Sequence, residues 1–109
     1  ALEIGPNNDS AWARRGQVLR RLDRHADALK AYQKALAIAP SYAWAWNGRG
    51  LAFAALNQWE DALACYEEAT RIAPQDVWFW HNRGEALTRL ERWEEAIRIF
   101  SKPTSERHG

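Results

Sequence analysis

Apolar and small residues follow two spacings along this chain, a short one and a long one. Within short segments they fall at i, i+4 and i+7, as Trp12, Gly16 and Leu19 do, which places them on one face of an α-helix. The same residue types then return every 34 positions. Four series show the long spacing: Trp12, Trp46 and Trp80; Gly16, Gly50 and Gly84; Tyr32, Tyr66 and Phe100; Pro6, Pro40 and Pro74. A fixed period of this length is typical of proteins built by stacking one repeated unit.

The pattern predicts an all-α chain with two helices in each of three units. We expect the helices near residues 9–22, 26–39, 43–56, 60–73, 77–90 and 94–102. Asn57 falls in a predicted turn, which suits an asparagine because this residue tolerates a left-handed backbone. Pro40 and Pro74 follow the second helices of the first two units and end them, since the residue before a proline is driven out of the helical region.

The expected organisation is that of a piece of a longer repeat array. Residues 1–8 resemble the endings of the complete units and are interpreted as the end of a preceding repeat. The three units then cover residues 9–42, 43–76 and 77–102, and a polar tail covers 103–109. The third unit is predicted to be truncated because Pro103 stands where the pattern requires an alanine, and proline ends a helix.

Three mid-helix glycines predict close contacts between helices. A glycine inside a helix costs about 1 kcal/mol relative to alanine, which is tolerable where a neighbouring helix must come close. We expect alanines of the second helices opposite the glycines and tryptophans as wedges beside them. The glycines are Gly16, Gly50 and Gly84, the facing residues Ala28, Ala62 and Ala96, and the wedges Trp12, Trp46 and Trp80. Trp59 and Trp93, near the starts of second helices, are predicted to pack between units.

Three arginines recur just before these glycines. A buried guanidinium needs partners, and acidic residues recur on the second helices with the same spacing. We therefore predict three internal ion pairs, formed by Arg15, Arg49 and Arg83 with Asp27, Asp61 and Glu95. The functional alternative is a ladder of arginines that binds phosphates, which the balanced charge of the chain disfavours.

The composition disfavours several kinds of binding partner and of chemical site. The 109 residues include 15 Lys and Arg against 14 Asp and Glu, a net charge of +1, whereas nucleic-acid and membrane binders commonly carry a strong basic field. Cys65 is the single cysteine and the three histidines are isolated, so we expect no metal site. No phosphate-binding loop or catalytic motif is present. We expect a cytoplasmic, non-catalytic protein that uses no cofactor and binds neither nucleic acid nor membrane.

The motif W-x3-G-x2-[LF], followed by A-x3-[YF]-x2-A-x4-P, resembles the tetratricopeptide repeat (TPR), a helix–turn–helix unit of 34 residues. This resemblance implies a right-handed α-solenoid of antiparallel helix pairs. It also implies a protein-interaction module that binds a peptide or a helix of a partner protein in a concave groove. TPR arrays line the groove with first-helix residues, which here are Ser10, Ala13, Gln17 and Arg20, with Arg21 at the rim; Trp44, Asn47, Leu51 and Ala54; and Trp78, His81, Glu85 and Thr88.

Trp44 and Trp78 allow two interpretations. Each lies two residues before a wedge tryptophan and therefore points about 200° away from it around the helix. Either both face the groove and bind a partner, or both pack on neighbouring side chains. In the first case they flank an apolar notch formed by Leu51 and Ala54 in the middle unit, with Arg20 toward one end and Glu85 toward the other. We then expect a partner segment with a bulky apolar side chain.

One TPR subfamily binds the carboxylates of chaperone tails with Lys, Asn and Arg at set places. Those places hold Ala13, Gln17, Gly48, Trp78 and Asn82, so the basic clamp is missing and this subtype is not expected. Three alternatives to groove binding remain open. The chain could be a structural or self-assembly spacer, a regulatory arm of a larger multidomain protein, or a binder of single-stranded RNA.

The charge distribution adds an expectation of head-to-tail self-association through the repeat ends. Residues 1–54 carry eight basic and four acidic side chains, a net charge of +4. Residues 55–109 carry seven basic and ten acidic side chains, a net charge of −3. A head-to-tail contact would place the basic half of one molecule against the acidic half of the next.

Overall fold

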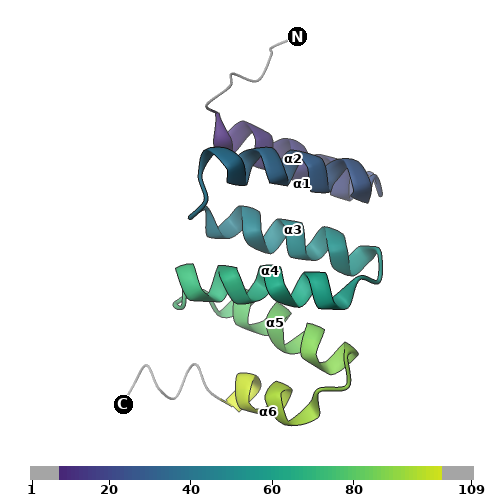
Figure 1. Cartoon of the computed structure of the whole chain (residues 1–109), viewed down its shortest axis with the longest axis vertical. Coiled ribbons are helices and arrows are strands. Elements are labelled where there is room, and N and C mark those ends of the chain that lie inside the picture. Colours follow the sequence, from purple (N-terminus) through teal and green to yellow (C-terminus); the bar gives the residue numbers. More distant parts are fainter. Residues whose placement is uncertain (1–7, 102–109) are drawn as a thin grey trace.

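The computed structural model describes residues 8–101, which form six α-helices stacked in chain order (Figure 1). They are α1 (Asp9–Arg21), α2 (His25–Ile38), α3 (Ala43–Ala55), α4 (Trp59–Ile72), α5 (Val77–Arg89) and α6 (Trp93–Ser101). Each helix packs on the next one in the chain, and α1 also contacts α3. The predicted all-helical solenoid is thus confirmed. The expectations for residues 1–7 and 102–109, including the helix stop at Pro103, lie outside the described residues.

Side-chain caps account for the starts of α1 and α5. The side chain of Asn8 accepts a 2.9 Å hydrogen bond from the backbone N–H of Ala11 at the start of α1. Asp76 caps α5 in the same way, by accepting a 3.0 Å bond from the N–H of Trp78. Such caps satisfy N–H groups that have no partner within the helix.

Within residues 8–101, no helix is both long and apolar enough to span a bilayer.

The three turns inside the units share one backbone feature. Asp23, Asn57 and Glu91 have φ angles of 62°, 61° and 61°, which place all three in the left-handed region. The prediction for Asn57 is confirmed, and Asp23 adopts the same geometry with a residue type that tolerates it. Glu91 is the least suited of the three. Each second helix begins two residues after this turn residue, one residue before its predicted start.

The close contacts at the mid-helix glycines are confirmed, but an aromatic ring rather than an alanine faces each glycine. A Cβ atom at Gly50 would lie 2.5 Å from Cε1 of Tyr66, and one at Gly84 would lie 2.5 Å from Cζ of Phe100. The predicted facing residues are buried in the core but are not the nearest groups to the glycines: Ala28, Ala62 and Ala96. The glycines therefore make room for rings of the second helices.

The wedge tryptophans tie each unit to the loop before it. Nε1 of Trp46 donates a 2.8 Å hydrogen bond to the carbonyl oxygen of Pro40, and Nε1 of Trp80 donates a 2.7 Å bond to that of Pro74. Both indoles are half-buried and pack against the core. The equivalent acceptor for Trp12 would be a residue outside the described range. Each tryptophan thus satisfies its single donor while filling the space between helices.

The prediction of three arginine–carboxylate pairs between helices is wrong. Asp27 is paired with Arg24 at 2.8 Å, and Glu95 is paired with Arg92 at 2.7 Å, in both cases three residues earlier in the chain. Asp61 is exposed on α4. Pairs at i and i+3 form on one helix without any requirement on the neighbouring helix, so they are the easier pairs to make.

Two of the recurring arginines, Arg49 and Arg83, instead contact aromatic rings, and Arg83 also donates a hydrogen bond to a hydroxyl. The guanidinium of Arg49 lies 5.7 Å from the centroid of the Trp46 ring, and that of Arg83 lies 5.1 Å from the Trp80 ring. Arg83 also donates a 3.0 Å hydrogen bond to Oγ1 of Thr70, which is buried. Cation–π contacts of this kind stabilise a guanidinium without a carboxylate. Arg49 and Arg83 therefore serve the packing of wedge tryptophans, whereas Arg15 is exposed and Lys34 lies over the ring of Trp12 at 5.2 Å.

Candidate interaction face on the first helices

The predicted site residues all lie on α1, α3 and α5, the first helices of the three units. We call them the first-helix face, which consists of Gln17, Arg20, Arg21, Trp44, Asn47, Leu51, Ala54, Trp78, His81 and Glu85. Two interactions join neighbouring first helices. Nδ2 of Asn82 donates a 2.9 Å hydrogen bond to Oδ1 of Asn47, and the guanidinium of Arg14 lies 5.6 Å from the centroid of the Trp44 ring. Adjacent units are therefore linked through two residues of the predicted site itself, Trp44 and Asn47.

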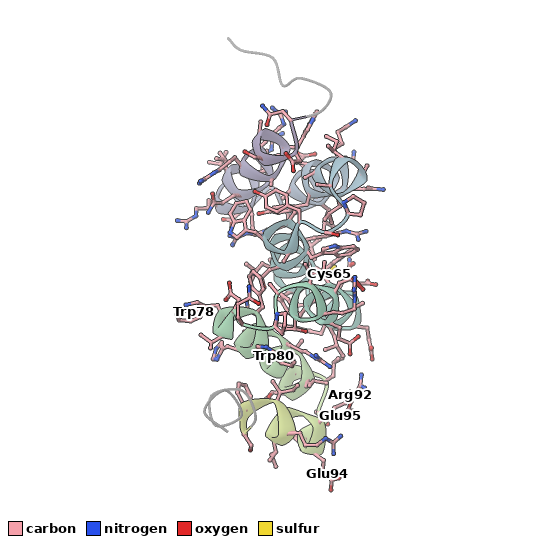
Figure 2. All side chains as sticks on the ribbon, turned by 90° about the vertical axis from the view of Figure 1, so that its left-hand side faces the viewer. Cys65, Trp78, Trp80, Arg92, Glu94 and Glu95 are labelled. Carbon is pink, nitrogen blue, oxygen red and sulfur yellow. The ribbon has the colours of Figure 1, made fainter. Side chains whose placement is uncertain are left out.

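Trp78 is the most exposed large hydrophobic residue of this face, with 70% of its surface accessible. Its ring packs edge-on against His81 with a centroid distance of 6.1 Å, and His81 packs against Phe100 of α6 at 5.8 Å. Figure 2 shows Trp78 projecting on the opposite side of the stack from Arg92 and Glu95. Three aromatic side chains of the third unit thus form one exposed row.

Trp44 occupies the same repeat position as Trp78 but is half-buried. The guanidinium of Arg14 lies over its ring, and Tyr42 packs beside it with a centroid distance of 6.1 Å. The residue that corresponds to Arg14 one unit later is Gly48, which has no side chain to cover Trp78. The two interpretations left open by the sequence therefore divide between the two positions: Trp44 packs on neighbouring side chains, and Trp78 is exposed.

The middle of the face is less accessible than its two ends. Asn47 is buried and makes the hydrogen bond to Asn82, so its main contact is structural. Leu51 and Ala54 are half-buried and pack against the core of the second and third units. Gln17 and Arg20 are also half-buried, whereas Arg21, His81 and Glu85 are exposed. The accessible apolar surface therefore lies toward the third unit.

Two opposite charges act on a buried hydroxyl beneath this face. Burial raises the pKa of Tyr66, the nearby carboxylate of Glu85 raises it further, and Arg20 lowers it. Burial likewise raises the pKa of Tyr32, while the nearby guanidinium of Arg20 opposes that shift. Nε of Arg20 is itself buried and has no hydrogen-bond partner among the described residues. The charges of Arg20 on α1 and Glu85 on α5 therefore shift the pKa of the same tyrosine in opposite senses.

Three residues beside the face were not predicted to belong to it: Arg14, Asn82 and Phe100. Arg14 and Asn82 share one repeat position, directly after a predicted groove position, so the first-helix pattern could have included them. Phe100 lies on a second helix, where the pattern marks it as a core residue. Only its exposure in the structure shows that it extends the aromatic row. Within residues 8–101, no group of three or more His, Cys, Asp or Glu side chains could hold a metal ion.

Known proteins share this architecture. Two family models described as tetratricopeptide repeat match residues 9–75 and 65–98. The crystal structure of MamA superposes with a TM-score of 0.89 at 23% identity, over 95% of this chain and 61% of that one. The present chain thus spans less than two thirds of MamA. A search of curated proteins found no match.

Two further similar structures contain chaperone peptides. The second TPR domain of Spaghetti (RPAP3), bound to the HSP90 peptide SRMEEVD, has a TM-score of 0.84 at 20% identity, over 88% of this chain and 89% of that one. The TPR2B domain of yeast Sti1, in its pHsp70 complex, has a TM-score of 0.83 at 20% identity, over 86% of this chain and 75% of that one. At these identities the likeness concerns the fold. With family models matching most of the sequence and six helices stacked in the expected order, the chain belongs to the tetratricopeptide repeat family.

Proposed function

We propose that this chain is a non-catalytic protein-interaction module that binds a peptide or a helix of a partner protein along the first-helix face. The observation that carries this proposal is the exposed row of Trp78, His81 and Phe100. Large aromatic side chains on a surface are the residues that most often dominate binding energy once a partner covers them. The chaperone-peptide complexes of structurally similar TPR domains support a partner of this kind.

The proposed partner carries a bulky apolar side chain that packs between Leu51 and Trp78. In this proposal the half-buried Leu51 of α3 and the exposed Trp78 of α5 form the two sides of the site. This shifts the expected anchor from the middle unit toward the third unit, because Trp44 is already covered by Arg14 and Tyr42. Glu85 is exposed at this end and favours a basic residue next to the apolar anchor.

The test uses a phage-displayed library of random peptides selected against the whole chain. The affinity of the selected peptides is then measured for the wild type, for Trp78→Ala and for Trp93→Ala. Trp93 is a matched control because it is also an exposed tryptophan, with 56% of its surface accessible, at the start of α6 and beside Arg92 and Glu95. Circular dichroism establishes that both variants remain helical.

We expect Trp78→Ala to weaken peptide binding by about 30-fold, the equivalent of roughly 2 kcal/mol for an aromatic anchor. Trp93→Ala should leave the affinity within about twofold. Equal affinities for wild type and Trp78→Ala, or a larger loss for Trp93→Ala, would place the binding surface elsewhere and refute the proposal.

A further inference from the structure

The repeat register shows that two surfaces of this chain are exposed where the inner units are buried. On α1, Val18 is 57% exposed, whereas the residues at the same position of α3 and α5, Ala52 and Ala86, are fully buried. We call the surface around Val18 and Leu22 the leading face; Leu22 is 61% exposed, against 37% for its counterpart Leu56. Ala52 and Ala86 lie on the helices that follow α2 and α4. In this register the leading face is thus the surface that a preceding second helix would cover.

The last helix, α6, likewise exposes residues whose counterparts in the earlier second helices are buried. Phe100 is 52% exposed, whereas Tyr32 and Tyr66, at the same repeat position, are buried. Ile97 is 64% exposed, whereas its counterpart Leu63 is buried. We call the surface formed by Ile97 and Phe100 the trailing face. It exposes side chains at positions that inner units keep from water.

Inside the chain, a first helix covers the surface that corresponds to the trailing face. The helix α3 packs on α2, and α5 packs on α4. The contact is close, because a Cβ atom at Gly48 of α3 would collide with the ring of Tyr32 of α2. What suits the trailing face is therefore another first helix with its outer surface free. Among the described helices, α1 is the one that meets this condition.

We propose that the leading face of one molecule packs on the trailing face of a second copy, so that the helical stack continues from molecule to molecule. The helices α1 and α6, which carry the two faces, lie at opposite ends of the stack (Figure 1), so the contact is heterologous and leaves a free face at each end of the assembly. Repeat units are expected to gain stability from each neighbour that covers them. The association is therefore open-ended and depends on concentration.

Charge supports a second copy as the occupant. The helix α1 carries four arginines and one aspartate, and α6 carries two glutamates and one arginine. The faces thus bring a strongly basic helix against a weakly acidic one. A symmetric contact between two leading faces would instead bring two copies of the basic helix α1 together. Electrostatics therefore favours the head-to-tail contact over a symmetric one.

Sedimentation velocity across a hundredfold range of concentration tests this proposal with two single variants of the whole chain. Val18→Glu blocks the leading face and Ile97→Glu blocks the trailing face, and both positions are exposed, so the helical fold of each variant should survive. Val77→Glu is the control, because Val77 is an exposed valine of α5 outside both faces. Circular dichroism checks the helix content of all three variants.

We expect the sedimentation coefficient of the wild type and of Val77→Glu to rise with concentration, and that of each blocked variant to stay at the monomer value. An equimolar mixture of Val18→Glu and Ile97→Glu should form a dimer and nothing larger, because one intact leading face and one intact trailing face remain. A symmetric contact cannot produce this pattern.

The proposal is refuted by a wild type that stays monomeric over the whole range, or by a mixture that does not dimerise. A monomeric wild type that begins to associate when residues 102–109 are removed would show that this segment, rather than a second copy, covers the trailing face. Trp78→Ala should associate like the wild type. Trp78 lies outside the trailing face, so this variant separates self-association from peptide binding at Trp78, although Phe100 belongs both to the aromatic row and to the trailing face.

Discussion

Replacing Gly50 by alanine separates helix propensity from packing. In a solvent-exposed helix this change stabilises the folded state by about 1 kcal/mol, because glycine has the larger conformational entropy to lose. Here the new methyl group would lie 2.5 Å from Cε1 and 2.7 Å from Cδ1 of Tyr66. These atoms belong to the edge of a ring that is 2% exposed, so the ring cannot swing into solvent. The helices themselves would have to separate.

Overpacking of this kind typically costs 1 to 3 kcal/mol in the free energy of unfolding. Set against the gain of about 1 kcal/mol in propensity, we expect Gly50→Ala to destabilise the fold by about 1 kcal/mol. Gly84→Ala is the matched control. Its methyl group would meet Cζ, the far end of the Phe100 ring, and that ring is half exposed and free to move. We expect this variant to be unchanged or stabilised by up to about 1 kcal/mol.

Urea unfolding followed by circular dichroism measures both free energies, and the slope m shows whether the transition has kept its character. The reasoning predicts that Gly84→Ala is more stable than Gly50→Ala by at least about 1 kcal/mol. If the two variants are stabilised equally, helix propensity alone determines the free energy of unfolding at both sites. The close contact at Gly50 then makes no contribution to it. If both are destabilised equally, the mobility of the facing ring is irrelevant.

Three further changes test other parts of the structure. Glu91→Asn should stabilise the fold by about 0.5 kcal/mol in urea unfolding, because asparagine tolerates the left-handed backbone at this turn better than glutamate; an unchanged midpoint would contradict this. Trp46→Phe removes the donor to the carbonyl of Pro40 and should cost about 1 kcal/mol, whereas the same change at the exposed Trp93 should cost nothing measurable. Because burial raises the pKa of Tyr66 above its ordinary value of 10.0, its contribution to stability is present below that pH and lost above it. Tyr66→Phe should therefore show a smaller loss of stability between pH 10 and 11 than the wild type, by up to about 1 kcal/mol, and an identical loss would show that this hydroxyl does not control the alkaline transition.

The fold could be predicted because its determinants recur in the sequence. Gly50 and Gly84, and likewise Trp46 and Trp80, return at one spacing, so the number of helices and their order in the stack follow from a single period. The predicted helix boundaries are wrong by one residue at the starts of the second helices, where a left-handed residue two positions earlier sets the start. That geometry was predicted for an asparagine but not for Glu91.

The partners of long side chains could not be predicted from the same period. Arg83 has Glu95 within electrostatic range, yet its hydrogen bond goes to Thr70 and Glu95 pairs with Arg92. A guanidinium on a flexible stem can reach several groups, and differences of a few ångströms decide among them. The spacing of residues on a helix does not resolve such differences, so the recurrence of charges indicated proximity but not pairing.

The difference between Trp44 and Trp78 has a cause that lies in another unit. Their own repeat positions are identical, but Arg14 covers the first ring and Gly48 leaves the second open. Gly48 in turn has no room for a side chain, because the ring of Tyr32 fills the space. Comparing each position with the residue 30 places earlier, across the unit boundary, would have separated the two tryptophans from sequence alone.

The hydrogen bonds from Trp46 to Pro40 and from Trp80 to Pro74 restrict how a chain of this kind can change its length. In each case donor and acceptor are six residues apart, and the rigid indole reaches one carbonyl oxygen. One residue inserted after the start of the first helix, ahead of the tryptophan, would rotate the indole by about 100° around the helix and carry it away from the proline. Insertions that keep both bonds must fall elsewhere or add a whole unit. Such a chain is therefore expected to lengthen during evolution by duplication of complete repeats.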